Sequence, residues 1–130
     1  MAAADPSPTT LILGLPTDEN APRQARKLVA DLVGRLNGKA IHRSDDLALV
    51  VSEMVSNAVL HGPPGKLEVR AIASDHVIRL EVSDSGTQPF ERNNHEPREH
   101  MGLPLIEILS DRFAVEQKPS TLIWCEFDLK

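Results

Sequence analysis

The sequence predicts an α+β fold: a two-layer α/β sandwich with one mixed, mostly antiparallel sheet and helices on one face. Two observations lead to this prediction. Two helical segments follow a single first strand, and the later strands come in adjacent pairs instead of alternating with helices. Within the strands apolar and polar residues alternate, so one sheet face is apolar and should carry the helices, while much of the other faces water.

The first half of the chain should form one strand and two helices. The strand is expected over residues 9–15, where every second residue from position 11 is leucine. The first helix is expected between Asn20, a favourable cap, and Gly38, which can close the helix in a left-handed conformation. A second helix should begin at Ser44 and stop at the Gly62-Pro63-Pro64 turn.

The second half should supply the rest of the sheet. Residues 67–71 and 78–82 alternate on either side of the turn residues Ser74 and Asp75, which predicts a hairpin. Residues 85–101 are polar, and a loop of this length in a small domain is usually functional or mobile. The remaining expected elements are a helix over 103–110 and strands over 112–115 and 122–129.

Length and composition exclude several classes of protein. We expect 130 residues to form a flexible leader over 1–8 and one domain over 9–130. The net charge of -5 argues against binding along a nucleic-acid backbone. No apolar run approaches the roughly 20 residues of a membrane span, so a cytoplasmic location is expected. The single cysteine, Cys125, lies in an alternating strand and is expected to be a buried small hydrophobe.

The second helix carries the most informative motif. Glu53, Asn57 and His61 are four residues apart, so they share one stripe of the helix beside an apolar stripe. A carboxylate can accept a proton from a nucleophile, and a side-chain amide oxygen can bind Mg²⁺. For His61, a histidine at a helix end without a chemical step is the preferred interpretation.

Asp84 ends the second strand of the hairpin on its inward face. A carboxylate there needs a hydrogen-bond donor, and the exocyclic amine of adenine would be one. Gly86 would let a flat ring approach the backbone closely. The alternative is that Asp84, Ser85 and Gly86 form only a turn.

A glycine begins the third helix after the polar loop. Free amide groups at a helix N-terminus bind phosphate, and Gly102 places no side chain in the way. The alternative is an ordinary helix start at Met101-Gly102-Leu103.

Taken in order, these motifs resemble the ATP-binding site of the superfamily that groups gyrase, heat-shock chaperones, histidine kinases and mismatch-repair ATPases. More closely, the chain resembles the bacterial anti-sigma-factor serine kinases of the partner-switching type. The similarity covers nearly the whole chain. It is carried by Ala25-Arg26, residues 52–59, His61-Gly62, residues 82–84, residues 101–103 and the last strand with Trp124.

The resemblance implies a Bergerat-type fold, ATP and Mg²⁺ as cofactors, and a role for several residues. Glu53 would be the general base that prepares a serine hydroxyl of a protein substrate, and Asn57 would coordinate Mg²⁺. Asp84 would accept from the adenine amine. The other implied nucleotide contacts are Gly86 beside the base, Thr121 near the adenine, and Met101, Gly102 and Leu103 at the triphosphate.

The resemblance also implies protein partners. These would be a sigma factor and a small anti-anti-sigma protein of the STAS type, and Arg26 would meet the partner at the surface. A homodimer is implied by the resemblance as well. Trp124 either marks a further partner contact or is a partly buried residue of the sheet.

Two other functions compete with an ATP-dependent serine kinase. The family's adenine-side glycine box usually has another glycine where this chain reads Asp84-Ser85-Gly86-Thr87-Gln88, and His100 stands where a glycine is common. These departures favour a partner-binding module of the same fold with weak or no nucleotide binding. Intact Glu53 and Asn57 favour the kinase. The third candidate is a metal hydrolase that uses His61, His95 and His100, whose spacing is not compact.

Overall fold

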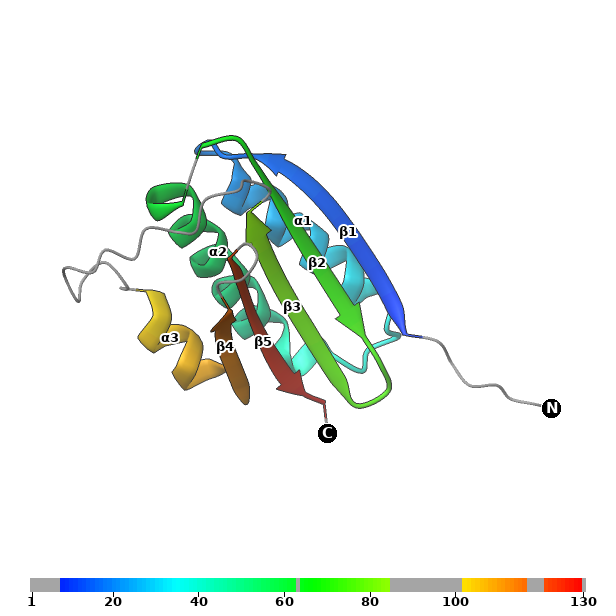
Figure 1. Ribbon diagram of the computed structural model, residues 1–130. Helices are drawn as coiled ribbons and strands as arrows, with labels where there is room; N and C mark the ends of the chain where they lie inside the picture. Colours follow the sequence, from blue (N-terminus) through cyan, green and yellow to red (C-terminus); the bar gives the residue numbers. More distant parts are fainter. Residues whose placement is uncertain (1–7, 63, 85–101, 117–120, 130) are drawn as a thin grey trace.

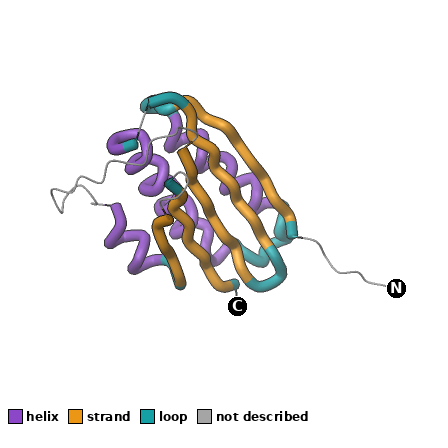
Figure 2. The backbone as a smooth tube through the Cα atoms, in the orientation of Figure 1, coloured by secondary structure: helices purple, strands orange, loops and turns teal. Residues whose placement is uncertain are grey.

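The protein is built on a five-stranded sheet with its helices packed against one face (Figures 1 and 2). The computed structural model describes residues 8–62, 64–84, 102–116 and 121–129. Across the sheet the strands follow the order β1-β2-β3-β5-β4. Their bounds are Thr9–Pro16 (β1), Lys66–Ala73 (β2), Val77–Asp84 (β3), Arg112–Glu116 (β4) and Leu122–Asp128 (β5).

Two long helices and one short helix form the second layer. Helices α1 (Ala21–Gly34) and α2 (Ser44–His61) pack against each other behind the sheet, and a 3-10 turn over Ile41–Arg43 leads into α2. The short helix α3 (Gly102–Leu109) lies against α2 and next to β4. Among the described helices, none has the length and apolar character needed to cross a membrane.

The predicted α+β sandwich is confirmed, with two differences in detail. All four pairings between the described strands are antiparallel, so the mixed pairing that we expected is wrong for this part of the chain. The first helix ends at Gly34 and not at Gly38. Asn37 and Gly38 do have positive φ angles, of 53° and 86°, but they reverse the chain in a separate turn after the helix. Leu36 packs on the core from that turn, which explains why its spacing looked helical.

The alternation expected for the sheet is present in β2, β3 and β5. In β3 the inward residues Ile78, Leu80, Val82 and Asp84 are buried, and the residues between them are half-buried. Cys125 on β5 is fully buried 3.8 Å from the sulfur of Met54, and burial raises the pKa of its thiol to about 12. The thiol is therefore protonated at neutral pH and acts as a small core residue, as predicted.

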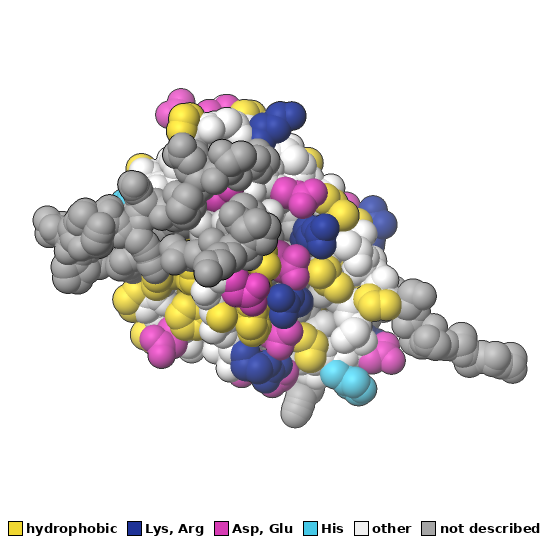
Figure 3. Space-filling view, viewed as in Figure 1, with side chains coloured by type: hydrophobic (Ala, Val, Ile, Leu, Met, Phe, Trp, Pro, Cys, Tyr) yellow, Lys and Arg dark blue, Asp and Glu magenta, His cyan; other side chains and the backbone are white. Residues whose placement is uncertain are grey.

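The face of the sheet away from α1 and α2 is polar and its charges are paired. Arg79 donates to Glu81 at 2.7 Å and to Glu126 at 3.0 Å, so it connects two positions on β3 and β5. Its guanidinium lies 4.2 Å from the centre of the Trp124 ring, and the indole nitrogen of Trp124 donates to Glu116 at 3.0 Å. Figure 3 shows acidic and basic side chains alternating on this side. Trp124 is half-buried, so the interpretation as a partly buried sheet residue is confirmed.

Candidate nucleotide-binding site

The described residues of the predicted nucleotide site lie on elements that come together at one end of the sheet. The end of β3 and the start of β5 lie at the end toward which α2 runs (Figure 1), and α2 contacts both β3 and α3. Four parts of the chain therefore border a common region: the second half of α2, the last residue of β3, the residue before β5 and the first turn of α3. The predicted loop over 85–101, with Gly86 and Met101, lies outside the described residues, as do Ser85, Thr87, His95 and His100.

Asp84 is buried at this end of the sheet, with 4% of its surface exposed. The backbone N–H of Thr121 donates to its carboxylate at 3.3 Å, and the backbone N–H of Asp84 donates to the carbonyl of Thr121 at 3.3 Å. This reciprocal pair holds the carboxylate where β3 ends and β5 is about to begin. A carboxylate has about four acceptor positions, so it can take donors from a ligand in addition to those of the protein.

Thr121 is also fully buried. It lies directly before β5, and β5 is the strand that pairs with β3. Thr121 was predicted as a site residue only from the resemblance of the chain to the kinase family. The structure places it in hydrogen-bond contact with Asp84. These two buried polar residues form the sheet side of the site.

Helix α2 supplies the opposite side. Its buried stripe fixes how the helix is rotated, so Glu53, Asn57 and His61 lie half-buried along the boundary of that stripe. The fully buried residues of the stripe are Leu47, Val50, Val51, Met54, Val55 and Ala58.

The side-chain amide of Asn57 is the strongest local sign of a ligand. Its Nδ2 atom is buried and has no hydrogen-bond partner among the described residues. A buried polar group without a partner costs about 1–3 kcal/mol, so native structures rarely contain one without a reason. Turning the amide would bury the oxygen at the same place, and either atom then needs a partner.

These oxygen donors have the chemistry of a magnesium site. Mg²⁺ prefers hard oxygen ligands and keeps several waters and substrate phosphates in its shell, so one protein oxygen such as that of Asn57 suffices. No group of three or more histidine, cysteine or acidic residues that could hold a metal by itself occurs in the described part of the chain. Asn57 therefore fits an ion that is shared with a phosphate chain.

Helix α3 closes the site on the side of β4. It begins at Gly102, Leu103 is half-buried, and Ile106 is fully buried and packs in the core. Pro104 occupies the first turn, where its missing N–H removes no helical hydrogen bond. The N-terminal end of α3 is thus held near α2 with its backbone donors free of helical partners.

Arg26 lies on α1 and is linked to the same helix that carries Glu53. Its guanidinium donates to the hydroxyl of Ser52 at 2.8 Å, one residue before Glu53. The local sequence pattern does not predict this contact, because the two residues are 26 positions apart. Next to it is a cavity of about 350 Å³ between α1 and α2, lined by Arg26, Val29, Ala30, Val33, Gly34, Ser44, Asp45 and Ala48.

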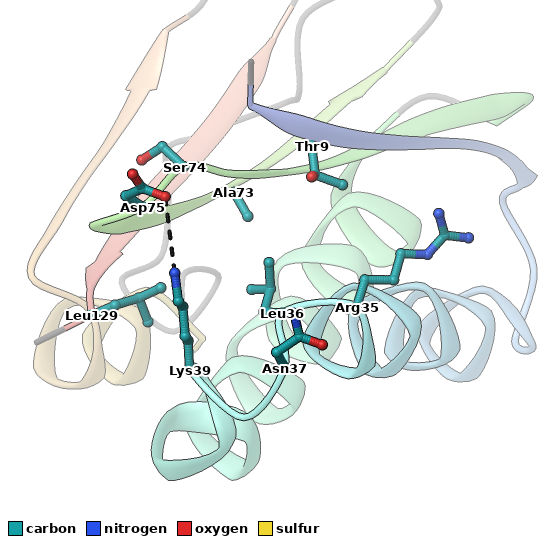
Figure 4. A pocket seen from close by; sticks show the side chains of 9 residues that line it. All are labelled: Thr9, Arg35, Leu36, Asn37, Lys39, Ala73, Ser74, Asp75 and Leu129. Carbon is teal, nitrogen blue, oxygen red and sulfur yellow. Dashed lines mark ion pairs between the residues drawn. The ribbon is translucent and has the colours of Figure 1, made fainter. Parts of the chain in front are cut away.

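A second cavity lies where β1 begins, the β2–β3 turn projects and the chain connects α1 to α2 (Figure 4). Lys39 reaches from that connection to Asp75 in the turn, with 4.0 Å between their charged atoms. The volume of this second cavity, about 160 Å³, is below the roughly 300–1,000 Å³ of typical ligand pockets. None of the predicted site residues lines it.

The sheet and helices have the arrangement of a histidine kinase-like ATPase domain, and the family model of that description matches residues 15–125. In the solved structures, the chain resembles a crystal structure of the RsbU and RsbW domains of a Mycobacterium tuberculosis protein, with a TM-score of 0.72 and 24% identity. That likeness covers 93% of this chain and 32% of the other, and it supports the fold.

Curated relatives point to one group within this class. The anti-sigma F factor of Thermoanaerobacter sp. (strain X514) is 31% identical over 108 residues, which are 73% of this chain and 75% of that protein. The anti-sigma F factor of Geobacillus kaustophilus (strain HTA426) is 32% identical over 108 residues, covering 72% and 73%. That of Bacillus subtilis (strain 168) is 28% identical over 109 residues, covering 73% and 74%. The chain belongs to the histidine kinase-like ATPase family, in the group that contains the anti-sigma F factors.

Proposed function

We propose that this chain is a cytoplasmic anti-sigma factor that binds ATP and phosphorylates a serine of an anti-anti-sigma partner. Two observations carry the proposal: Asp84 is buried at the end of β3, and on α2, which contacts β3, the Nδ2 atom of Asn57 is buried without a hydrogen-bond partner among the described residues. The membership in a family of ATPase domains, and the names of its relatives, support the same function.

Each side of the site would hold a different part of the nucleotide. Asp84 would accept a hydrogen bond from the adenine amine, with Thr121 beside it. The amides at the start of α3, at Gly102 and Leu103, would face the phosphates, and Asn57 would hold Mg²⁺. From their sequence positions alone, we place Gly86 beside the base and Met101 at the triphosphate. Bound ATP supplies the phosphoryl group, and Mg²⁺ neutralises its charge.

Glu53 would act on the protein substrate. Its half-buried carboxylate accepts the proton of a serine hydroxyl while the serine oxygen forms a bond to the γ-phosphorus and the bond to ADP breaks. Glu53 and Asn57 are four residues apart and share one stripe of α2. The packing of α2 fixes its rotation, so the general base and the residue that would hold Mg²⁺ are positioned together.

The protein partners would dock on the side of α1 and α2. Arg26 is exposed there, and its bond to Ser52 attaches a cation to the residue that precedes Glu53 on α2. The cavity between α1 and α2 has an apolar floor that includes Val29 and Val33 and begins at Arg26. This surface suits a partner that brings acidic and apolar side chains with its serine. The sigma factor and the STAS-type protein would use it in turn, and a homodimer remains a prediction.

The alternative is a partner-binding module of the same fold that binds little or no nucleotide. The glycine missing from residues 84–88, and His100 at a position where glycine is common, favour it. The buried Nδ2 atom of Asn57, which has no hydrogen-bond partner among the described residues, argues for the kinase, because a module without nucleotide would keep this buried group at a cost and for no purpose.

Phosphotransfer decides between the two. The purified chain is incubated with γ-labelled ATP, Mg²⁺ and a small protein of the STAS class, and the label is followed on a serine of that protein. Saturable transfer that disappears on chelation of Mg²⁺ supports the kinase. Tight binding of the STAS protein without any transfer would establish the module instead.

A further inference from the structure

Arg43 makes the most concentrated set of long-range contacts in the described part of the chain. It stands directly before α2, and its guanidinium donates to the carbonyl of Leu109 at 3.1 Å, to the carbonyl of Asp128 at 2.9 Å and to the carboxylate of Asp111 at 3.2 Å. The same group lies 4.8 Å from the centre of the Phe127 ring. One side chain thus joins the start of α2 to the end of α3 and the end of β5.

The bond to Leu109 matters because Leu109 is the last residue of α3. The final carbonyls of a helix have no partner within it, and a cation there satisfies one of them and complements the negative end of the helix dipole. Helix α3 has eight residues, too few to be stable by itself in water. It therefore depends on its contacts, which include the buried side chain of Ile106, the packing of Leu103 and Leu109 on the core and the clamp from Arg43.

We propose that Arg43 is a positioning residue for the phosphate end of the nucleotide, acting through α3. This inference rests on the proposed function, in which the start of α3 faces the phosphates. Eight residues of helix span about 12 Å, so a helix held at Leu109 presents Gly102 at a set distance and direction. Because α2 carries Asn57 and begins next to Arg43, the clamp also ties the phosphate-facing end of α3 to the helix that holds the ion.

Binding energy is the physical link. If α3 is already ordered, ATP does not have to order it, and the affinity for the phosphate chain is higher. Adenosine has no phosphate, so its affinity depends on the sheet side of the site at Asp84 and Thr121. Loss of the clamp should weaken ATP much more than adenosine.

Arg112 is a matched control. It also bonds to a charged residue of β5, with its Nη2 atom 2.5 Å from the carboxylate of Asp128, and it donates to Glu126 at 2.8 Å. Its contacts lie on β4 and β5 and none of those described reaches α3. Lysine at either position keeps the charge but loses the planar fork that bonds to several acceptors at once.

The test uses the full chain as Arg43→Lys, Arg43→Met and Arg112→Lys, with ATP and adenosine titrated by calorimetry and α3 followed by amide hydrogen exchange without ligand. We expect Arg43→Lys to weaken ATP by about tenfold and adenosine by less than about twofold, with faster exchange in α3 and unchanged exchange in β3. Arg112→Lys should bind ATP and adenosine with the affinities of the wild type. The exchange measurement requires no nucleotide, and Arg43→Lys serves if Arg43→Met does not fold.

Equal losses of ATP and adenosine affinity in Arg43→Lys, or α3 exchange at the wild-type rate, would overturn the inference. A wild-type chain that binds no ATP overturns the proposed function first, and with it the link from Arg43 to phosphate, while hydrogen exchange still reports whether Arg43 holds α3. The two failures are thereby distinguishable.

Discussion

The two faces of strand β3 carry acidic residues with opposite surroundings. On the outer face, Glu81 accepts from Arg79 at 2.7 Å, and Glu126 on the neighbouring strand accepts from both Arg79 and Arg112. On the inner face, Asp84 is buried near the end of α2, where the amide of Asn57 has a buried atom without a described partner. The outer charges neutralise one another and stay in contact with water, which is how a solvated sheet face is built. The inner polar groups are in the core at a cost, and a function is the usual reason for such a cost.

The largest expected effect tests the chemistry on the inner side. Glu53→Gln keeps the size of the side chain but cannot accept the serine proton, so phosphotransfer should fall by about 10²–10⁴-fold. ATP affinity should stay close to the wild type. Glu81→Gln on the outer face is the control and should leave transfer unchanged. Transfer at the wild-type rate in Glu53→Gln would remove the general base from the account.

The next effect concerns the partner surface beside Glu53. Arg26→Glu reverses the charge at this position and removes the guanidinium that donates to Ser52. It should weaken binding of the STAS-type partner by about 10–100-fold, as for a central interface residue. ATP affinity should not change. Arg23→Glu is the matched control, because Arg23 is exposed on the same helix and bonds only locally, to Asn20 at 3.4 Å. Equal losses in both variants would indicate a general charge effect and no specific contact.

A smaller effect, of opposite sign, tests whether Asn57 is kept for binding and not for folding. Asn57→Leu replaces a buried amide without a partner by an apolar side chain of similar size, so the free energy of unfolding of the ligand-free protein should rise by about 1–2 kcal/mol. The same variant should lose the Mg²⁺ dependence of ATP binding. Thermal or denaturant unfolding measures the first, and titration with and without Mg²⁺ the second. A variant less stable than the wild type would show that Asn57 is satisfied in the fold.

The smallest effect concerns the outer face and its dependence on pH. The hydrogen bond from Arg112, and then that from Arg79, lower the pKa of Glu126 below its usual value near 4.5. A carboxyl with a lowered pKa in the folded state stabilises the protein above its ordinary pKa, and this contribution is lost as pH falls through the lowered value. Glu126→Gln should therefore reduce stability at neutral pH by at most about 1 kcal/mol and flatten its fall below pH 4.5. The same fall of stability below pH 4.5 in Glu126→Gln and in the wild type would contradict this.

Periodicity was enough to predict the elements and the face to which each strand residue belongs. It placed Asp84 inward, Cys125 in the core and the ends of α2 within a residue, because burial imposes a period of two on strands and 3.6 on helices. The antiparallel pairing of every described strand and the early end of α1 at Gly34 did not follow from it. Both depend on how distant segments meet, which a local pattern does not contain.

The same limit explains what was missed around the site. The bond between Arg26 and Ser52 spans 26 positions, and that between Arg43 and Asp128 spans 85. An arginine in a sequence gives no sign of which distant carbonyl it will reach. The possible chemistry of Glu53, Asn57 and Asp84 followed from the residues themselves, whereas their particular roles and the proposal of Thr121 came from resemblance. The structure adds their positions and the contact between Asp84 and Thr121.

The most direct test of the central claim compares the two faces of β3 in one titration. ATP with Mg²⁺ is titrated calorimetrically into the wild type, Asp84→Asn and Glu81→Gln. We expect saturable binding in the wild type and in Glu81→Gln, and a loss of affinity of about 10-fold or more in Asp84→Asn, because the side chain of asparagine has one acceptor oxygen and that of aspartate has two. No binding heat in the wild type at millimolar ATP, or equal affinity in all three proteins, would contradict it.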